Sequence, residues 1–345
     1  MGGGAVAQHA RPARRLKDFS LGCNRRSAQH LPGNPPSIDE QFRMVKACGL
    51  YDHYDAVPQP GQEAEYLRAV EKHDFPMRTG LWTYAKGRDE ALLPKNLQLQ
   101  KDARGECHNI MLFDRHADGH RLSDEEVVEF YLRAYEIGEK LGLQIAFEVH
   151  IYMWSEDLRR VAVVADKVQA RGATFNFVLD HSHVLLKLDN PEEQALCGIR
   201  EDVETGKLLL DPYEDGNLVD AWIARNMTVW AQVRPVVPRG PKNVMARHPD
   251  GRIGRACQYP FVRPKPGEFH DEWHAYRLEP SKEVVRKVLR HHRDNAASRL
   301  RYMTTEYIDL ADYGEGCRYS LFEQSLALAA WIRSTWEQIK REAPA

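Results

Sequence analysis

A chain of 345 residues with 43% hydrophobic residues can bury a large core, either as one α/β barrel or as two ordinary domains. Its 48 basic and 50 acidic residues are interspersed and give a formal net charge of -2, which argues against a nucleic-acid partner or an acidic membrane. No run approaches the roughly 20 apolar residues of a membrane span. A small neutral or weakly charged ligand is favoured instead.

The six cysteines are scattered without a CxxC pair, and a chain of this length needs no disulfide framework. We therefore expect reduced thiols and a cytoplasmic location. The N-terminal segment contains basic residues but lacks the apolar stretch of a signal peptide. We predict a disordered tail over residues 1–15 and a single domain over residues 16–345.

Short apolar runs alternate with amphipathic segments along the chain, which is typical of a parallel sheet wrapped in helices. We predict eight strands, at residues 18–24, 53–57, 76–85, 107–113, 143–150, 174–183, 227–236 and 301–308. Helix starts are expected near Ser37, Gln62, Ser123, Ser155, Asn217, Ser281 and Ser320. The third helical pattern is interrupted by Pro94. Eight strand–helix units predict a (β/α)8 TIM barrel rather than an open sheet.

Two connections exceed normal loop length, at residues 184–216 and 237–280. They follow the sixth and seventh predicted strands. Loops after barrel strands lie on the C-terminal face, where the active sites of such barrels are built. We expect these two loops to enclose a substrate.

Polar residues break the apolar pattern at the ends of four predicted strands. In the middle of a barrel strand the inward side chains should be apolar, so polar residues at the C-terminal end are informative. Alternate residues of a strand share one face, so Glu148 and His150 point the same way. The polar strand ends are Glu148 and His150 on strand five, Asp180, His181 and His183 on strand six, Gln232 and Arg234 on strand seven, and Glu306 on strand eight.

Carboxylates at matched heights on strands five, six and eight would converge near the barrel axis, where they repel one another unless a cation lies among them. We predict Glu148, Asp180 and Glu306 as metal ligands, with the amide oxygen of Gln232 as the fourth. An all-oxygen set suits Mn2+ or Mg2+. The competing interpretation makes each acid a solvated loop residue or half of a salt bridge.

The segments FEVH, LDHSH and TTEYI, each with an acidic residue at a strand end, resemble the xylose isomerase-like barrel superfamily of sugar isomerases, epimerases and dehydratases. In its ketose-epimerase branch, the resemblance implies a Glu, Asp, His and Glu metal site and a substrate-binding His three residues after the Asp, as in Asp180 and His183. Gln232 departs from this pattern. His270 or His274 from the long loop is an alternative nitrogen ligand.

His150 is a second departure from the epimerase pattern. The resemblance implies that epimerases use their two metal-bound glutamates, here Glu148 and Glu306, as acid and base. His150 projects about 6.6 Å beyond Glu148 along the strand, so it can overhang a bound sugar and act as a general base. The competing interpretation is a histidine hydrogen-bonded at the barrel rim.

The pair Glu148 and His150 also resembles the large subunit of bacterial C-glycoside deglycosidases. That resemblance implies a metal that polarises a 3-keto sugar, a histidine that removes the neighbouring proton, elimination of the aglycone, and a small β-rich partner subunit. A homo-oligomer is the alternative assembly.

Further residues are candidates for substrate binding. We predict this role for His183 and Arg234, although both could be structural donors. Trp82, with Trp154, could provide the flat apolar wall on which a sugar packs, or could belong to the core. Residues 112–126 are rich in His and Asp, but their spacing matches no zinc finger or EF-hand, so we interpret them as an active-site loop.

Together these patterns predict a divalent-metal enzyme that acts on a small carbohydrate or glycoside. It would remove a proton next to a carbonyl, the step that isomerisation, epimerisation and elimination share. A hypothesis of another class is a non-catalytic sugar-binding barrel.

Overall fold

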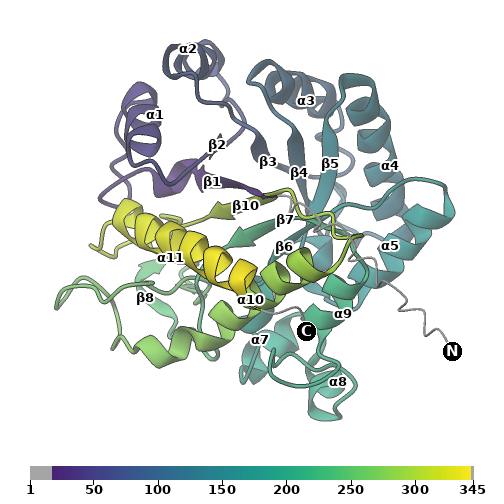
Figure 1. Cartoon of the computed structure of the whole chain (residues 1–345). Coiled ribbons are helices and arrows are strands. Elements are labelled where there is room, and N and C mark those ends of the chain that lie inside the picture. Colours follow the sequence, from purple (N-terminus) through teal and green to yellow (C-terminus); the bar gives the residue numbers. More distant parts are fainter. Residues whose placement is uncertain (1–17, 343–345) are drawn as a thin grey trace, which may run out of the picture.

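The computed structural model describes residues 18–342, so the tail predicted for residues 1–15 lies outside the described residues. Eight parallel strands close into a barrel in the order β1-β10-β7-β6-β5-β4-β3-β2, and helices surround it (Figure 1). The predicted (β/α)8 barrel is confirmed.

All eight barrel strands fall within the predicted ranges. Their bounds are Ser20–Asn24 (β1), His53–Asp55 (β2), Thr79–Tyr84 (β3), Cys107–Leu112 (β4), Gln144–Glu148 (β5), Phe177–Asp180 (β6), Thr228–Val233 (β7) and Tyr302–Thr305 (β10). The sixth strand is shorter than predicted. The backbone N–H of Ser182 donates to Asp180 Oδ1 at 2.9 Å, and the chain turns at once into the short helix α6 (Ser182–Leu185).

The longer helices of the outer ring are α1 (Ile38–Ala47), α2 (Glu63–His73), α3 (Leu92–Asp102), α4 (Asp124–Leu141), α5 (Arg160–Ala170), α9 (Leu218–Ala224), α10 (Glu279–Asp294) and α11 (Leu321–Arg341). The side chains of Ser37, Ser123, Asn217 and Ser320 cap four of them as predicted. Pro94 lies in the first turn of α3, where a backbone N–H has no partner within the helix, so the helix tolerates it.

The helix start predicted at Ser155 is wrong, because α5 begins at Arg160. Ser155 lies in the short 3-10 helix η2 (Trp154–Glu156). Its hydroxyl donates to the carbonyl of Glu148 at 2.6 Å and accepts the N–H of His150 at 3.2 Å. Ser155 therefore fixes the backbone at the end of β5 instead of capping a helix.

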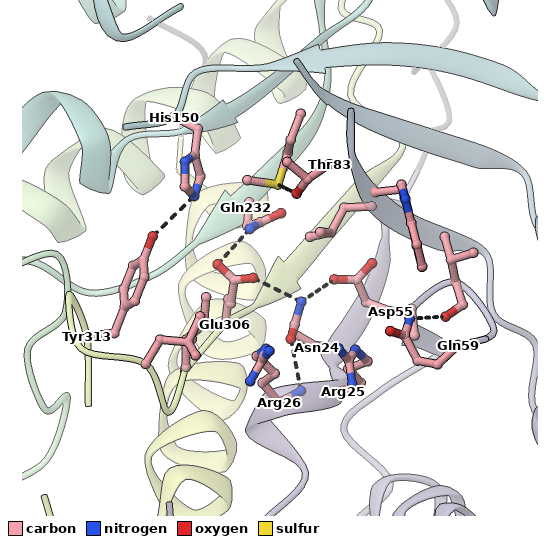
Figure 2. A pocket seen from close by; sticks show the side chains of 17 residues that line it. Asn24, Arg25, Arg26, Asp55, Gln59, Thr83, His150, Gln232, Glu306 and Tyr313 are labelled. Atoms are coloured by element: carbon pink, nitrogen blue, oxygen red, sulfur yellow. Dashed lines mark hydrogen bonds between the residues drawn. The ribbon is translucent and has the colours of Figure 1, made fainter. Parts of the chain in front are cut away.

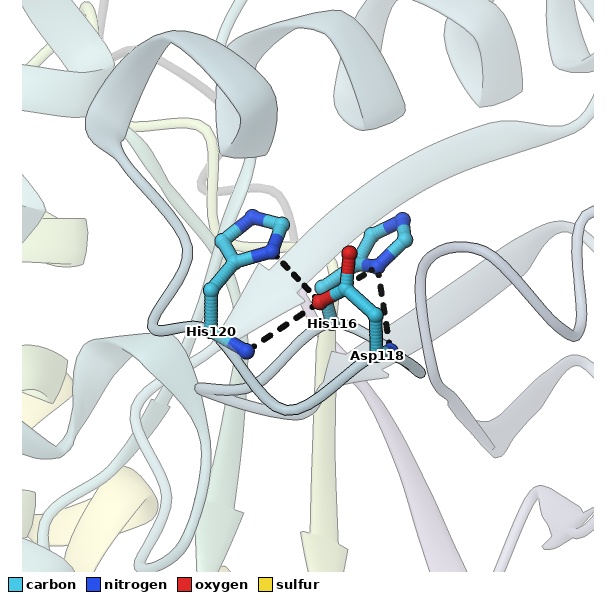
Figure 3. Close-up of side chains that lie close together, drawn as sticks. All are labelled: His116, Asp118 and His120. Atoms are coloured by element: carbon cyan, nitrogen blue, oxygen red, sulfur yellow. Dashed lines mark hydrogen bonds and ion pairs between the residues drawn. The ribbon is translucent and has the colours of Figure 1, made fainter.

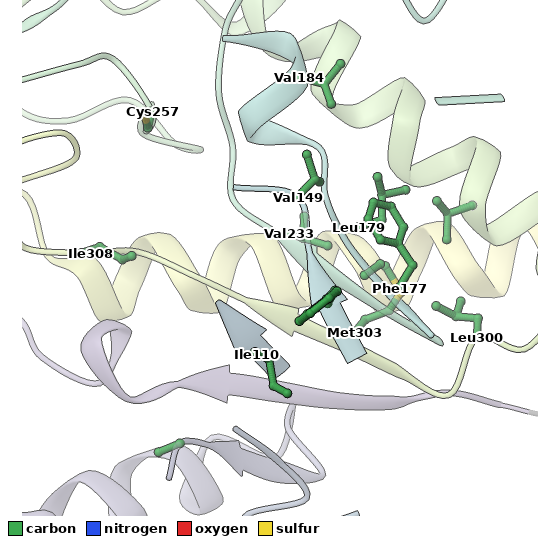
Figure 4. Packing of buried hydrophobic residues seen from close by; sticks show 14 of the residues in the cluster. Ile110, Val149, Phe177, Leu179, Val184, Val233, Cys257, Leu300, Met303 and Ile308 are labelled. Carbon is green, nitrogen blue, oxygen red and sulfur yellow. The ribbon is translucent and has the colours of Figure 1, made fainter. Parts of the chain in front are cut away.

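Side chains alternate along each strand between the helix-facing core and the barrel interior. On β6, Phe177 and Leu179 join the core between strands and helices, which Figure 4 shows together with Met303 of β10. Val178 belongs to a separate cluster that fills the interior and also contains Cys107, Ala146, Val229, Trp230 and Tyr302. The next inward positions toward the C-terminal end are polar, and they carry the candidate site.

The two long connections follow β6 and β7, as predicted. Residues 186–217 include the short helices α7 (Pro191–Leu196) and α8 (Arg200–Glu204). Residues 234–278 include the antiparallel pair β8 (Asn243–Arg247) and β9 (Ile253–Gly254) and the 3-10 helix η3 (Ala275–Leu278). The Asn243 amide donates to the carbonyls of Ala311 and Tyr313, which ties this loop to the one after β10.

All six cysteines are free thiols. Within residues 18–342, none of the helices has the length and apolar character needed to cross a membrane.

Candidate metal centre and substrate cavity

A ring of buried polar side chains occupies the upper interior of the barrel. The sequence patterns predicted four of its members and missed three, which come from β1, β2 and β4. The ring consists of Asn24, Asp55, Asn109, Glu148, Asp180, Gln232 and Glu306. Asn24 and Asp55 end their strands, so the rule applied to the other strands would also have identified them.

Glu148, Asp180 and His183 form the closest group of possible metal ligands in this ring. One donor atom from each lies within 4.8 Å of the other two. His183 joins because the chain turns into α6 directly after Asp180, which brings its Nε2 to 3.3 Å from Asp180 Oδ2. Glu148 Oε1 and His183 Nδ1 are buried without a hydrogen-bond partner among residues 18–342. A bound cation would satisfy ligand atoms of this kind, so they fit a metal site.

Arg234 compensates part of the acidic charge that we expected a cation to neutralise. Its Nη2 lies 2.9 Å from Asp180 Oδ2 and directly contacts Glu306 Oε2. Its Nη1 donates to Ser182 Oγ at 2.9 Å and lies 3.1 Å from His183 Nε2. The side chain is completely buried, so the guanidinium holds both carboxylates in place within the interior of the protein.

Glu306 and Gln232 are linked to each other and lie beside the close group. Gln232 Nε2 donates to Glu306 Oε2 at 2.6 Å, and Gln232 Oε1 has no partner among the described residues. Asn24 Nδ2 bridges Glu306 Oε1 and Asp55 Oδ2 at 3.0 Å each. Glu306 is thus surrounded by donors, and the nearest unsatisfied oxygen on this side is that of the Gln232 amide.

The two loop histidines do not supply the nitrogen ligand. His270 Nε2 lies 3.1 Å from the carbonyl oxygen of Pro241, and His274 Nε2 lies 3.2 Å from Glu272 Oε2. The loop after β7 carries both rings to these other partners, and neither ring belongs to the close group of possible ligands. His183 provides the nitrogen that lies beside the two carboxylates.

A cavity of about 390 Å³ opens beside this ring, and Asn24, Asp55, Gln232 and Glu306 line it. Figure 2 shows the lining side chains. Apolar and polar side chains share its wall. Trp82 is one of the lining residues, as predicted, but Trp154 is completely buried and packs on Phe147 with ring centroids 5.3 Å apart. The main polar lining consists of Asn24, Arg25, Arg26, Asp55, His150, Gln232, Glu306 and Tyr313, and the apolar lining includes Leu81, Met111, Ile308 and Leu310.

His150 lines the cavity just beyond the end of β5. Its Nδ1 lies 2.6 Å from the carbonyl oxygen of Ile151, so this nitrogen carries the proton and donates. The Tyr313 hydroxyl lies 3.2 Å from Nε2 and donates to it (Figure 2). The ring also lies against His183, with centroids 4.0 Å apart. Tyr313 follows β10, and no strand pattern in the sequence indicated it.

The pKa values of the three carboxylates are shifted in different directions. Burial raises the pKa of Glu148 well above its usual value, and the charges of Asp180 and Glu306 add to this. Burial alone would also raise the pKa of Asp180, but Arg234 and His183 outweigh it and hold this pKa well below its usual range. Burial raises the pKa of Glu306 despite the opposing charge of Arg234. A cation bound beside Glu148 would lower its pKa again by favouring the charged form.

The site histidines are neutral at pH 7. Burial lowers the pKa of His150 well below its usual value, and the charges of His183 and Arg234 lower it further. Burial lowers the pKa of His183 to about 4, against the attraction of Asp180. On the other side of the ring, burial raises the pKa of Asp55 to about 7. Neutral imidazoles can serve as a metal ligand or as a general base.

No sequence-family model and no curated protein matches the chain. Solved structures match its fold. The 3-keto-D-glucoside 4-epimerase of E. coli is 13% identical over 92% of this chain and 100% of its own, with a TM-score of 0.50. The D-allulose 3-epimerase of Methylomonas sp. is 10% identical over 94% and 100%, with a TM-score of 0.53. A xylose isomerase-like barrel from Mycobacterium smegmatis, solved with magnesium, is 10% identical over 93% and 98%, with a TM-score of 0.53. The chain has the xylose isomerase-like TIM-barrel fold.

Proposed function

We propose that this protein is a divalent-metal-dependent enzyme that removes a proton next to the carbonyl of a sugar or keto-sugar. The observation that carries the proposal is the group of Glu148, Asp180 and His183, with its unsatisfied ligand atoms. On the neighbouring strand, Gln232 pairs with Asp180 and lines a cavity that a neutral histidine also lines. The balanced net charge favours a small, weakly charged substrate over nucleic acid.

Glu148, Asp180 and His183 would hold the metal, with the free amide oxygen of Gln232 as a further ligand. When bound, the ion supplies a Lewis acid that polarises the carbonyl of the substrate. One nitrogen among mostly oxygen ligands favours Mn2+ over Mg2+. This set replaces Glu306 by His183 as a ligand and leaves Glu306 in contact with Arg234 at the cavity surface.

His150 would act as the general base. Donation from Nδ1 to the Ile151 carbonyl fixes the tautomer, so Nε2 carries the lone pair that accepts a proton. The Tyr313 hydroxyl occupies that lone pair in the free enzyme and would turn to the substrate when Nε2 is needed. Glu306 is the second acid–base candidate at the cavity surface, as Glu148 would be if it were not bound to metal.

The substrate class follows from the cavity wall. Trp82, Leu81 and Met111 offer an apolar surface for the C–H face of a sugar ring, while Asn24 and Asp55 offer polar groups for its hydroxyls. Two of the structural neighbours are epimerases named for a 3-keto-glucoside and for the ketose D-allulose, which supports carbonyl sugars as the first substrates to test.

Two fates of the deprotonated sugar fit this machinery. Return of the proton gives isomerisation or epimerisation, and loss of a leaving group gives elimination, as in cleavage of a 3-keto-C-glycoside. Elimination is favoured by His150, because an imidazole base leaves Glu306 free to protonate the leaving group. If the reaction is elimination, we expect a small β-rich partner subunit. If it is isomerisation or epimerisation, we expect the chain to associate with itself.

Hydrogen exchange tests the shared first step whatever the fate of the sugar. The purified chain with Mn2+ is incubated in D2O with ketoses, keto-inositols and 3-keto-C-glycosides, and NMR follows the C–H next to each carbonyl. We expect exchange with at least one class, and we expect it to stop in His150→Asn and after chelation of the metal. Binding of a sugar without exchange in any class would favour the non-catalytic barrel.

A further inference from the structure

A second group of metal-binding side chains lies in the loop between β4 and α4. One donor atom each from His116, Asp118 and His120 lies within 4.8 Å of the others. Asp118 Oδ1 is 3.1 Å from His116 Nδ1 and 2.6 Å from His120 Nδ1. Figure 3 shows how the three side chains lie together. The two imidazole rings are stacked, with centroids 4.7 Å apart. The group therefore consists of two nitrogens and one carboxylate oxygen that face one another.

The backbone holds these three residues in a tight turn. The N–H of His116 donates to the carbonyl of His120, and the N–H of Gly119 donates to the carbonyl of His116, both at 2.9 Å. Gly119 has a φ of 99°, which a side chain at this position would strain. Arg115 and Arg121 close the turn with an antiparallel bridge. The turn itself brings the ligand atoms together.

Glu126 supports His120 from behind the group. Its Oε1 lies 2.9 Å from His120 Nε2, and its Oε2 accepts from the backbone N–H and hydroxyl of Ser123 at the start of α4. The other ring nitrogen, Nδ1, lies 2.6 Å from Asp118 Oδ1, so His120 stands between two carboxylates. A carboxylate behind a ligating histidine is the usual supporting contact of protein metal sites.

Hydrogen bonds join the members of the group. His116 Nδ1 accepts the N–H of Asp118 at 3.3 Å, and His120 Nδ1 lies 2.6 Å from Asp118 Oδ1. A metal ion would replace these hydrogen bonds and release the proton that His120 shares with Asp118. All three side chains retain solvent exposure, so an ion can reach them.

We propose that His116, Asp118 and His120 bind a divalent cation of the Zn2+ class, with water completing its coordination. Two nitrogens and one oxygen suit Zn2+ better than Mg2+ or Ca2+. The site is separate from the barrel centre, and His116 also lines a second cavity of about 480 Å³ at the rim. The bound ion would tie the β4–α4 loop into one conformation at the mouth of the barrel.

Zn2+ titration of the metal-free chain tests the proposal. The barrel group is first removed with Glu148→Gln, so that remaining binding reports on the loop. We expect His116→Ala or His120→Ala in that background to weaken Zn2+ binding by roughly 10-fold or more, and Glu126→Gln by a similar or smaller factor. Glutamine still fits the capping position of α4, so that variant tests the charge behind His120.

His274→Ala is the matched control, because His274 is an exposed histidine paired with the carboxylate of Glu272 and lies outside both groups. It should leave Zn2+ affinity unchanged. Zn2+ should also raise the Tm of the Glu148→Gln chain, and the increase should vanish with His120→Ala. Equal affinities in the His116, His120 and His274 variants would overturn the site, and they would do so without bearing on the reaction proposed for the barrel.

Discussion

The guanidinium of Arg234 lies 2.9 Å from the carboxylate of Asp180, and both side chains are completely buried. The same nitrogen contacts Glu306, so one arginine joins two of the three carboxylates that the strand pattern placed at the barrel axis. The positive charge of Arg234 thus neutralises part of the negative charge that we expected a metal ion to neutralise. It leaves Glu148 as the acid without a fixed positive partner.

Replacing Arg234 with Met should destabilise the protein by about 3–5 kcal/mol, because it leaves Asp180 and Glu306 buried without their counter-charge. Mn2+ should restore part of this loss by binding the two carboxylates that have lost their contact with the guanidinium. Urea unfolding with and without Mn2+ measures both effects. Arg43→Met is the control, since its pair with Glu40 is exposed and its loss should cost far less than the loss of Arg234. Equal losses in the two variants would show that the buried contacts carry no special weight.

Glu148→Gln and His183→Ala should each abolish Mn2+ binding at the barrel centre while the chain stays folded, because each removes a donor from the close group. Glu306→Gln should retain the ion with weaker affinity, since Glu306 already contacts Arg234, Gln232 and Asn24. Elemental analysis and Mn2+ titration compare the Mn2+ affinities of these variants. All of them carry His120→Ala as well, which removes the metal-binding group in the β4–α4 loop.

An exposed acid provides the reference for these variants. Glu129 pairs only with Lys86 among the ion pairs of the described chain, far in sequence from the barrel ligands, and Glu129→Gln should bind Mn2+ like the parent. If Glu306→Gln lost the ion as completely as Glu148→Gln, the all-carboxylate ligand set expected from the sequence would be restored.

His150→Asn should keep the bound metal but lose roughly 10²- to 10⁴-fold in kcat, the usual contribution of a positioned base. Tyr313→Phe removes the hydroxyl on Nε2 without removing the base, so its loss in kcat should be much smaller. Metal content and the rate of hydrogen exchange in D2O are measured on the same preparations. Retention of most of the kcat in His150→Asn would move the base to Glu306.

The fold and half of the site were predictable because strand geometry determines them. A period of two along each strand identifies inward positions, and polar residues at the strand ends identify Glu148, Asp180 and Gln232. The role of Arg234 was not predictable in this way. Its long side chain can reach either the cavity or the carboxylates. Only the packing around Arg234 directs it to the carboxylates.

Residues outside the strands explain the other differences. His183 reaches the ligand group because α6 begins immediately after Asp180, whereas the pattern predicted a longer strand. Tyr313 comes from the loop after β10, and its distance from His150 in the sequence hides their contact. Trp154 looked like a wall of the cavity, but η2 turns it into the core beside Phe147.

Two histidines in the barrel strands have no part in the proposed chemistry and should make folding stability sensitive to acid. His53 of β2 and His108 of β4 are completely buried. Burial lowers the pKa of each to about 3, from an ordinary value of 6.5. His53 is satisfied by Ser20 and Thr79 at 2.9 Å each, and His108 contacts the Tyr84 hydroxyl at 3.1 Å. Both are held neutral in the folded chain.

The sign of the pH effect follows from these directions. Below pH 6.5 the unfolded chain binds protons at His53 and His108, whereas the folded chain keeps both histidines neutral. The free energy of unfolding is therefore undiminished above pH 6.5 and falls as the pH drops toward about 3. Each group should contribute a slope of about 1.4 kcal/mol per pH unit within this window. His108→Gln should therefore reduce the slope of the unfolding free energy between pH 6.5 and 5, measured by urea unfolding, while exposed His274→Gln should leave it unchanged. An identical slope in His108→Gln and the parent would mean that His108 is protonated in the folded barrel, and that the polar interior reaches water below the candidate site.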